Sequence, residues 1–254
     1  VCTYRLKEGR VAELELYLGT FMYDIDIAYT KKGRLDLALI SQLSGLNTLK
    51  IQDAILENGR SLIACDKLTH LELVSVEAKP LDFLKVLGQL ESLRIHDLEN
   101  FDVSLLQNLP KLSVLRLIDV EELLNYPKQF PILRKLEILD LSLKKLGTLA
   151  PFSKLTELRR FTLNRMETPR KLNRCDLIQV DDLSPLQSLC KLETLHLSGM
   201  IIGNPSIEAL KGLSRLKALS IDSQYVTHLP IWMADWNPGV DLFEAFQKCP
   251  LKSP

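Results

Sequence analysis

Residues 112–117, with the sequence Leu-Ser-Val-Leu-Arg-Leu, decide the fold of this chain, because their apolar pattern recurs along most of its 254 residues. Apolar residues occupy the first, fourth and sixth positions. The copies of this unit begin at Leu46, Leu68, Leu90, Leu112, Leu136, Leu158, Leu192 and Leu216, with a weaker copy before them at Met22, Ile25 and Ile27. Successive first positions are 24, 22, 22, 22, 24, 22, 34 and 24 residues apart, which predicts a structural repeat.

The last two apolar positions of each unit predict a short β-strand. They are two residues apart, which is the period of a strand, so both side chains point to one buried face. Further apolar residues follow each unit and are expected to close the turn over the core. One coil buries too few side chains to offset its own ordering entropy, so the coils must stack.

Three stretches resemble the leucine-rich repeat family, in its short 22-residue class known from protein phosphatase 1 regulatory subunits and internalins. They are residues 139–142 (Leu-Asp-Leu-Ser), 149–152 (Leu-Ala-Pro-Phe) and 182–186 (Asp-Leu-Ser-Pro-Leu). The resemblance implies an α/β fold: a curved, horseshoe-shaped solenoid with a parallel sheet on the concave side. Short helices, 3-10 turns or extended segments would form the convex side. Most family members bind proteins through the concave side.

The sequence departs from this family at one position of the repeat. Family members usually carry asparagine three residues after the last strand leucine, where its side chain satisfies backbone groups of the turn. This chain has no such asparagine ladder, so the buried backbone groups need other partners. The residues at that position are Val76, Leu98, Val120, Lys144, Met166, Met200 and Gln224.

The repeat positions divide the chain into three segments. Residues 1–21 are expected to form an N-terminal cap, in which residues 11–18 pair with residues 22–27. Residues 22–230 are expected to form about nine coils, with an insertion near 166–181. Residues 231–254 form a C-terminal cap or tail, whose aromatic residues either bury the last coil or dock a partner.

The outward residues of the predicted strands define a candidate binding surface on the concave face. Arginines beside exposed aliphatic side chains are typical of protein-binding surfaces. The alternative is an ion ladder that satisfies itself, surrounded by ordinary exposed aliphatics. Histidines on this face could make binding depend on pH. The predicted partner-binding residues are His70, Glu72, Val74, Arg94, His96, Val114, Arg116, Ile118, Ile138, Asp140 and Arg160.

The 34-residue unit contains a second candidate site. Its extra residues follow a predicted strand and include a basic cluster formed by Arg165, Arg170, Lys171 and Arg174. Insertions in repeat proteins often bind partners, although a solvated loop is equally expected. Four cations without interleaved aromatics are too few to indicate nucleic acid, which remains an unlikely partner except through this insertion.

Composition narrows the function class further. The chain has 32 basic and 32 acidic residues and five scattered cysteines, which favours a reducing compartment, in the cytoplasm or the nucleus. The sequence shows no phosphate-binding loop, nucleophile elbow, metal-ligand spacing or membrane-length apolar run, so we expect no enzyme activity, cofactor, metal site or membrane span. The sequence predicts a protein-interaction scaffold. Two alternatives are a substrate-recognition module of a ubiquitin ligase and a structural subunit of a ribonucleoprotein or cytoskeletal assembly.

Overall fold

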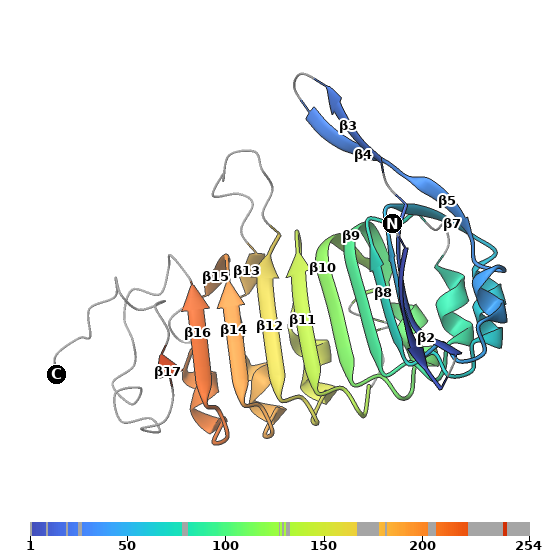
Figure 1. The fold of residues 1–254 in the computed structure, drawn as a ribbon. Helices are drawn as coiled ribbons and strands as arrows, with labels where there is room; N and C mark the ends of the chain where they lie inside the picture. The colour runs from blue at the N-terminus through green and yellow to red at the C-terminus, as the bar shows by residue number, and fades with distance from the viewer. Residues whose placement is uncertain are drawn as a thin grey trace, which may run out of the picture.

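The computed structural model shows one long curved sheet backed by short helices, as the repeat pattern predicts (Figure 1). The structure describes residues 2–8, 10–18, 20–24, 27–77, 81–126, 128, 130, 133–166, 178–180, 182–202, 207–222 and 241–242. Eleven strands form the main sheet in the order β1-β2-β6-β8-β9-β10-β11-β12-β14-β16-β17. Apart from the antiparallel pair β1 and β2, neighbouring strands are parallel.

From residue 48 to residue 222, each strand of the main sheet lies at the position that the repeat predicts, whereas the last strand, at residues 241–242, lies in the segment predicted as a cap or tail. The strands pair in equivalent register, so Leu71 is the partner of Leu93 and Leu93 of Leu115. The strands are β1 (Cys2–Lys7), β2 (Arg10–Tyr17), β6 (Thr48–Gln52), β8 (His70–Val74), β9 (Ser92–Asp102), β10 (Val114–Leu124), β11 (Ile138–Leu143), β12 (Arg160–Arg165), β14 (Thr194–Ser198), β16 (Ala218–Asp222) and β17 (Asp241–Leu242).

The convex side consists of 3-10 helices and extended segments, which confirms the expected coil type. The helices are η1 (Ile40–Gln42), η2 (Gly59–Ala64), η3 (Asp82–Val86), η4 (Val103–Asn108), η5 (Ala150–Lys154), η7 (Ser184–Ser188) and η8 (Glu208–Gly212). Two short parallel pairs lie between the main sheet and these helices: β5 (Gly33–Asp36) with β7 (Ala54–Glu57), and β13 (Ile178–Val180) with β15 (Met200–Ile202).

Asparagine and aspartate side chains secure the start of some of these helices. Asp102 precedes η4, and its carboxylate accepts a hydrogen bond from the Ser104 backbone N–H at 2.9 Å. The side chain of Asn125, from the next coil, donates to the same oxygen at 2.8 Å. Asp36 before η1 repeats the arrangement with Asn58. Asp102 satisfies an N–H of η4 that would otherwise have no partner, whereas Asp36 bonds the Ala38 N–H in the turn that precedes η1.

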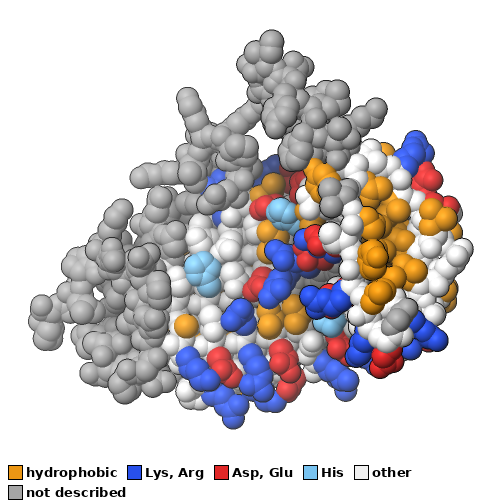
Figure 2. Space-filling view, viewed as in Figure 1, with side chains coloured by type: hydrophobic (Ala, Val, Ile, Leu, Met, Phe, Trp, Pro, Cys, Tyr) orange, Lys and Arg blue, Asp and Glu red, His pale blue; other side chains and the backbone are white. Residues whose placement is uncertain are grey.

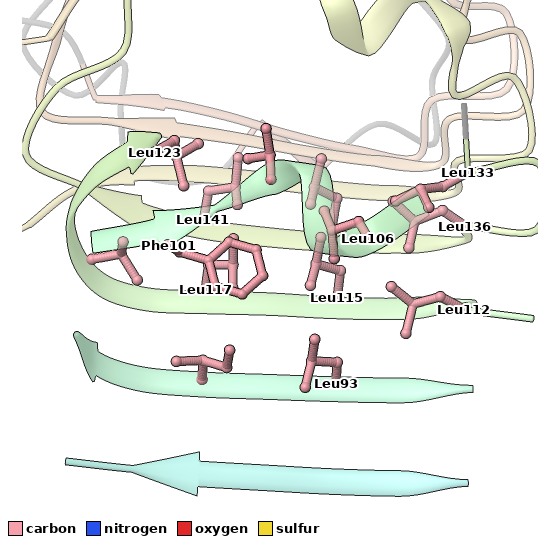
Figure 3. Close-up of a cluster of buried hydrophobic side chains, with 14 of the residues drawn as sticks. Leu93, Phe101, Leu106, Leu112, Leu115, Leu117, Leu123, Leu133, Leu136 and Leu141 are labelled. Carbon is pink, nitrogen blue, oxygen red and sulfur yellow. The ribbon is translucent and has the colours of Figure 1, made fainter. Parts of the chain in front are cut away.

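The core is a continuous column of leucines between the sheet and the convex helices (Figure 3). Leu93, Leu115 and Leu117 are at most 1% exposed, and Leu106 and Leu112 close the space from the convex side and the connecting turn. Phenylalanines replace leucine at a few positions and fill larger gaps. Because every coil contributes to the same column, no coil has a separate core.

In five coils, a left-handed residue stands two positions after the last apolar residue of the repeat unit, directly before the position of the missing asparagine. Asp53, Ser75, Asp97, Asp119 and Gly199 all have φ between 50° and 69°. After this turn the next residue continues into the convex side, where Val76, Val120 and Met200 are buried. Backbone groups of the turns bond to the next coil, as the Ser75 N–H does to the His96 carbonyl at 2.9 Å. The coils themselves therefore satisfy the backbone groups.

The first coil differs from the sequence prediction. Its strand in the main sheet is β2, which pairs with β6 through Leu14 with Leu49 and Leu16 with Ile51. The weak unit at Met22, Ile25 and Ile27 does not supply this strand, so the predicted pairing of residues 11–18 with 22–27 is wrong. Instead, β3 (Thr20–Asp24) and β4 (Ile27–Lys31) form an antiparallel hairpin that projects from the solenoid (Figure 1). Residues 10–17, which lie in the range predicted as an N-terminal cap, therefore form a strand of the main sheet.

Two predicted regions lie largely outside the described residues. Of the insertion near 166–181, the structure describes Met166 and the strand β13, which pairs with β15. Of residues 231–254, it describes β17, in which Leu242 pairs with Leu219. The tail aromatics Trp232, Trp236 and Phe246 lie outside the described residues, so capping and docking both stay predictions.

Candidate functional site

All predicted partner-binding residues lie at outward positions of strands β8 to β12. The strand registers place Glu72 beside Arg94, Arg94 beside Arg116, and Arg116 beside Asp140. The alternation of buried and partly exposed residues along β8, β10 and β12 confirms the predicted facing. Figure 2 shows charged side chains of both signs on this face, with hydrophobic ones beside them. The registers thus arrange these residues as adjacent columns across the strands.

The N-terminal part of this face is hollowed into an open cavity of about 430 Å³. Strands β1 and β2 form one wall, and β6, β8, β9 and β10 form the floor. Four predicted residues line it: His70, Glu72, Arg94 and Arg116. The other seven predicted residues do not line this cavity; Val74, His96, Val114, Ile118, Ile138, Asp140 and Arg160 lie on the same sheet face.

A row of charges crosses the strands at the centre of the face. Lys50 bonds Glu15 at 2.8 Å and lies 3.8 Å from Glu72, which in turn lies 3.9 Å from Arg94. The hydrogen bond and the charge of Lys50 hold the pKa of Glu15 below its ordinary value. Each of these side chains remains partly exposed, so the row is accessible from the groove.

Arg116 and Asp140 continue the row on the next two strands. The Nε of Arg116 donates to Oδ2 of Asp140 at 2.8 Å, and the Asp140 side chain is only 16% exposed. The other carboxylate oxygen of Asp140 is buried without a hydrogen-bond partner in the part of the chain that the structure describes. The Arg116 guanidinium therefore balances the negative charge of Asp140. Replacing Arg116 would leave a largely buried carboxylate without a counter-charge.

Half-buried aliphatic side chains flank the charged row on both sides. Val114 and Ile138 are adjacent in register on one side, and Val74 and Ile118 lie on the other. Binding of a partner that removes their remaining surface from water is favourable, because burial of apolar surface lowers the free energy. The site can thus combine charge recognition with apolar contact.

The histidines of this face are dispersed. His96 Nε2 lies 2.9 Å from one oxygen of Asp119, whose other oxygen accepts from the Ser142 hydroxyl at 2.9 Å. His70 Nδ1 bonds the hydroxyl of Thr69. Among the described residues, no group of three or more histidine, cysteine, aspartate or glutamate side chains is placed to hold a metal ion.

The sequence prediction missed the wall of the cavity. Thr3 and Arg5 of β1 bond Glu15 and Glu13 of β2, and all four line the cavity. The signal for β2 was present, because Val11, Leu14 and Leu16 match the repeat unit as well as Met22, Ile25 and Ile27 do. No repeat pattern marks β1, since it pairs antiparallel and lies outside the coils.

The predicted basic cluster of the insertion is only partly described. Arg165 ends β12, and its Cβ lies where a side chain at Gly199 would have to sit, 2.6 Å from an added Cβ. Arg170, Lys171 and Arg174 lie outside the described residues. Whether the four cations act together stays a prediction.

Solved structures with a similar fold are repeat proteins. The leucine-rich repeat ectodomain of the receptor kinase GASSHO1/SCHENGEN3 from Arabidopsis thaliana matches with a TM-score of 0.60 and 20% identity, over 83% of this chain and 26% of that one. The Arabidopsis receptor kinase HAESA, solved with the peptide hormone IDA and the co-receptor SERK1, matches with a TM-score of 0.58 and 18% identity, over 76% of this chain and 32% of that one.

Internalin C2 from Listeria monocytogenes matches with a TM-score of 0.44 and 19% identity, over 94% of this chain and 77% of that one. No protein-family model and no curated protein matches the sequence. The sheet, the convex 3-10 helices and the repeat register define a solenoid of stacked coils. The chain has the leucine-rich repeat fold.

No helix within the described ranges is long and apolar enough to cross a membrane.

Proposed function

We propose that this chain is a protein-binding scaffold whose partner lies in the N-terminal half of the concave face. The observation that carries the proposal is the 430 Å³ cavity, lined by partly exposed charges and continued by half-buried aliphatics. Arginine and apolar side chains together are enriched at the centres of protein interfaces. The leucine-rich repeat fold supports this use, since solenoids present extended concave surfaces to their partners.

The charge pattern favours a protein over a nucleic acid. A site for a nucleic-acid backbone needs a continuous basic stripe, because every nucleotide brings a phosphate. Here Glu15, Glu72 and Asp140 interrupt the row of cations. A folded or extended protein segment can match both signs.

We further propose binding without catalysis, in a reducing compartment of the cell. The charged row spreads over an open sheet face, which gives little of the water exclusion that catalysis uses. Cys2, Cys65 and Cys190 are free thiols. Alkylation of the protein from its native cell, followed by mass spectrometry, tests this: blocked thiols at these positions would contradict a reducing compartment.

The experiment that tests partner binding compares two isoleucine variants. Ile118 lies half-buried on the concave face, whereas Ile63 on η2 is 64% exposed on the convex side. We expect affinity purification with the wild-type chain and with Ile63→Ser to recover the same partners, and Ile118→Ser to lose them. Thermal melting confirms that each variant is folded.

Two results would contradict the proposal. One is recovery of the same partners by a folded Ile118→Ser chain, and the other is loss of partners with Ile63→Ser, which would place binding on the convex side. The identity of the recovered partners separates the remaining alternatives. Ubiquitin-ligase core subunits would indicate a substrate-recognition module, and RNA-bound or filament proteins a structural subunit.

A further inference from the structure

The charged row on the concave face breaks its alternation of sign at one place. From β2 to β9 the central residues alternate as Glu15, Lys50, Glu72 and Arg94. The next strand then places Arg116 directly beside Arg94. Adjacent strands are roughly 4.8 Å apart, and like charges directly opposite each other on a sheet are destabilising. A ladder that served stability alone would have an acidic residue at position 116.

We infer that Arg94 and Arg116 form a clamp for a carboxylate side chain on an extended segment of a protein partner. An aspartate or glutamate between the two guanidinium groups would restore the alternation of charge. Arginine recognises carboxylates through paired, charge-assisted hydrogen bonds. This inference rests on the proposed function and names the chemistry of its partner.

Both arginines have donors to offer. Among the described residues, the carboxylate that Arg94 approaches is that of Glu72, 3.9 Å away, and Glu72 also lies 3.8 Å from Lys50. That distance is beyond a hydrogen bond. Arg116 uses its Nε for Asp140, and a guanidinium carries four further N–H donors. The side chains are 45% and 33% exposed and line the same cavity.

The two carboxylates beside the arginine pair favour a ligand with a single negative charge over one with two. Glu72 and Asp140 stand on either side of the arginine pair, so the row is already balanced within its own residues. A phosphate group, with a charge near −2, would meet repulsion from both carboxylates. A single carboxylate, with a charge of −1, meets less repulsion from them.

The sheet face around the arginines favours a carboxylate side chain that belongs to a continuous segment of the partner. The sheet face extends past the arginines in both directions, toward β1 and toward β12. Val114 and Ile138 flank the row on one side and Ile118 on the other. We therefore expect the partner segment to carry aliphatic residues next to its acidic residue.

The test uses the full chain and random 12-residue peptides displayed on phage, followed by fluorescence polarisation with synthetic copies of the enriched peptides. Three protein variants are compared: Arg94→Gln, Ile118→Ser, and Arg60→Gln as the control, since Arg60 is an exposed arginine on the convex helix η2. Each peptide is also made with its acidic residue replaced by the amide, and with phosphoserine in its place.

We expect enriched peptides to carry an acidic residue beside aliphatic ones. Either the Arg94→Gln change or the amide replacement should raise Kd at least about tenfold, and the two together should have little further effect, which is the signature of a direct pair. Arg60→Gln should leave Kd unchanged, and phosphoserine should bind more weakly than the acidic residue.

The outcomes separate the clamp from the proposed function. Peptides that Ile118→Ser weakens but Arg94→Gln does not would overturn the clamp and leave concave-face binding intact. Tighter binding of phosphoserine would overturn the carboxylate assignment. Peptides insensitive to both variants, or no enrichment at all, would count against concave-face binding itself.

Discussion

At the scale of single residues, a left-handed residue in five of the coils helps a chain without the asparagine ladder to form this solenoid. Asp53, Ser75, Asp97 and Asp119 adopt the left-handed conformation, which costs about 1–2 kcal/mol for a residue with a Cβ. Aspartate is among the residues that tolerate it best. Side-chain bonds, such as the one from Ser75 to Asp97 at 2.7 Å, join these turns from coil to coil.

Gly199 is the residue at this turn for which we predict the clearest effect. Its φ is +69°, and a Cβ added there would lie 2.6 Å from the Cβ of Arg165. We expect Gly199→Ala to lower the free energy of unfolding by about 1–3 kcal/mol, measured by urea denaturation. Gly147→Ala and Gly212→Ala are the controls, because an added Cβ meets nothing within 4 Å at either position. Equal effects at all three positions would refute the assignment of strain to this turn.

The residue scale also shows how much of the candidate site the sequence could predict. The strict period of two along a strand fixes which side chains face outward, so the positions of Arg94, Arg116 and Asp140 were predictable. The contacts of Asp119 were not, because the left-handed turn breaks that period. Its bonds to His96 and Ser142 depend on a positive φ angle, and the presence of an aspartate alone does not predict that angle.

At the scale of elements, the sequence predicted the strands and the convex turns of the regular coils, and it failed at the first coil. The β3–β4 hairpin interrupts that coil and contains a second match to the repeat unit, so two competing registers were available. The later register, which begins at Met22, lies 24 residues before Leu46, and the same spacing separates other coils. The pairing of β2 with β6 in the structure shows that the earlier register, at Val11, Leu14 and Leu16, is the one that forms the first coil.

Asp102 supports a prediction about the helical elements. Burial would raise the pKa of this carboxyl, but hydrogen bonds from Asn125 and Ser104 outweigh it, and the pKa lies below its ordinary value of 3.8. A lowered pKa stabilises the fold above the ordinary value and ceases to do so as pH falls through the folded value. We expect Asp102→Ala to cost about 1 kcal/mol at pH 7 and progressively less below pH ~4.

Urea denaturation at pH 7 and at pH 3 or below measures this difference. Asp66→Ala is the control, because Asp66 is an exposed carboxyl in a convex turn. If Asp102→Ala lowered the free energy of unfolding by the same amount at both pH values, the carboxylate charge would not contribute to stability at the start of η4.

At the scale of the whole molecule, stability should decline from the middle of the sheet toward its ends. Coils contact mainly their neighbours, so a central coil is held on two sides and a terminal strand on one. All six residues of β1 are exposed, and among the described strands it pairs with β2 alone.

Hydrogen exchange followed by mass spectrometry tests this gradient. We expect backbone amides of β8 to β11 to exchange slowest and those of β1 fastest among the strands of the main sheet. The open β1 wall would then be the mobile side of the binding cavity. Uniform protection along the sheet would instead indicate that the chain unfolds as a single cooperative unit.

The antiparallel direction of β1 also bears on self-assembly. A stack of parallel coils has no inherent length, since each coil offers the next the same hydrogen-bond spacing and the same apolar column, and such repetition is how fibres elongate. β1 reverses the chain direction at one end of the sheet. A coil from another molecule that approached this end would meet antiparallel spacing and the exposed Tyr4 and Leu6 in place of a leucine column. We therefore expect the reversed strand to disfavour the addition of a further parallel coil at this end of the described sheet.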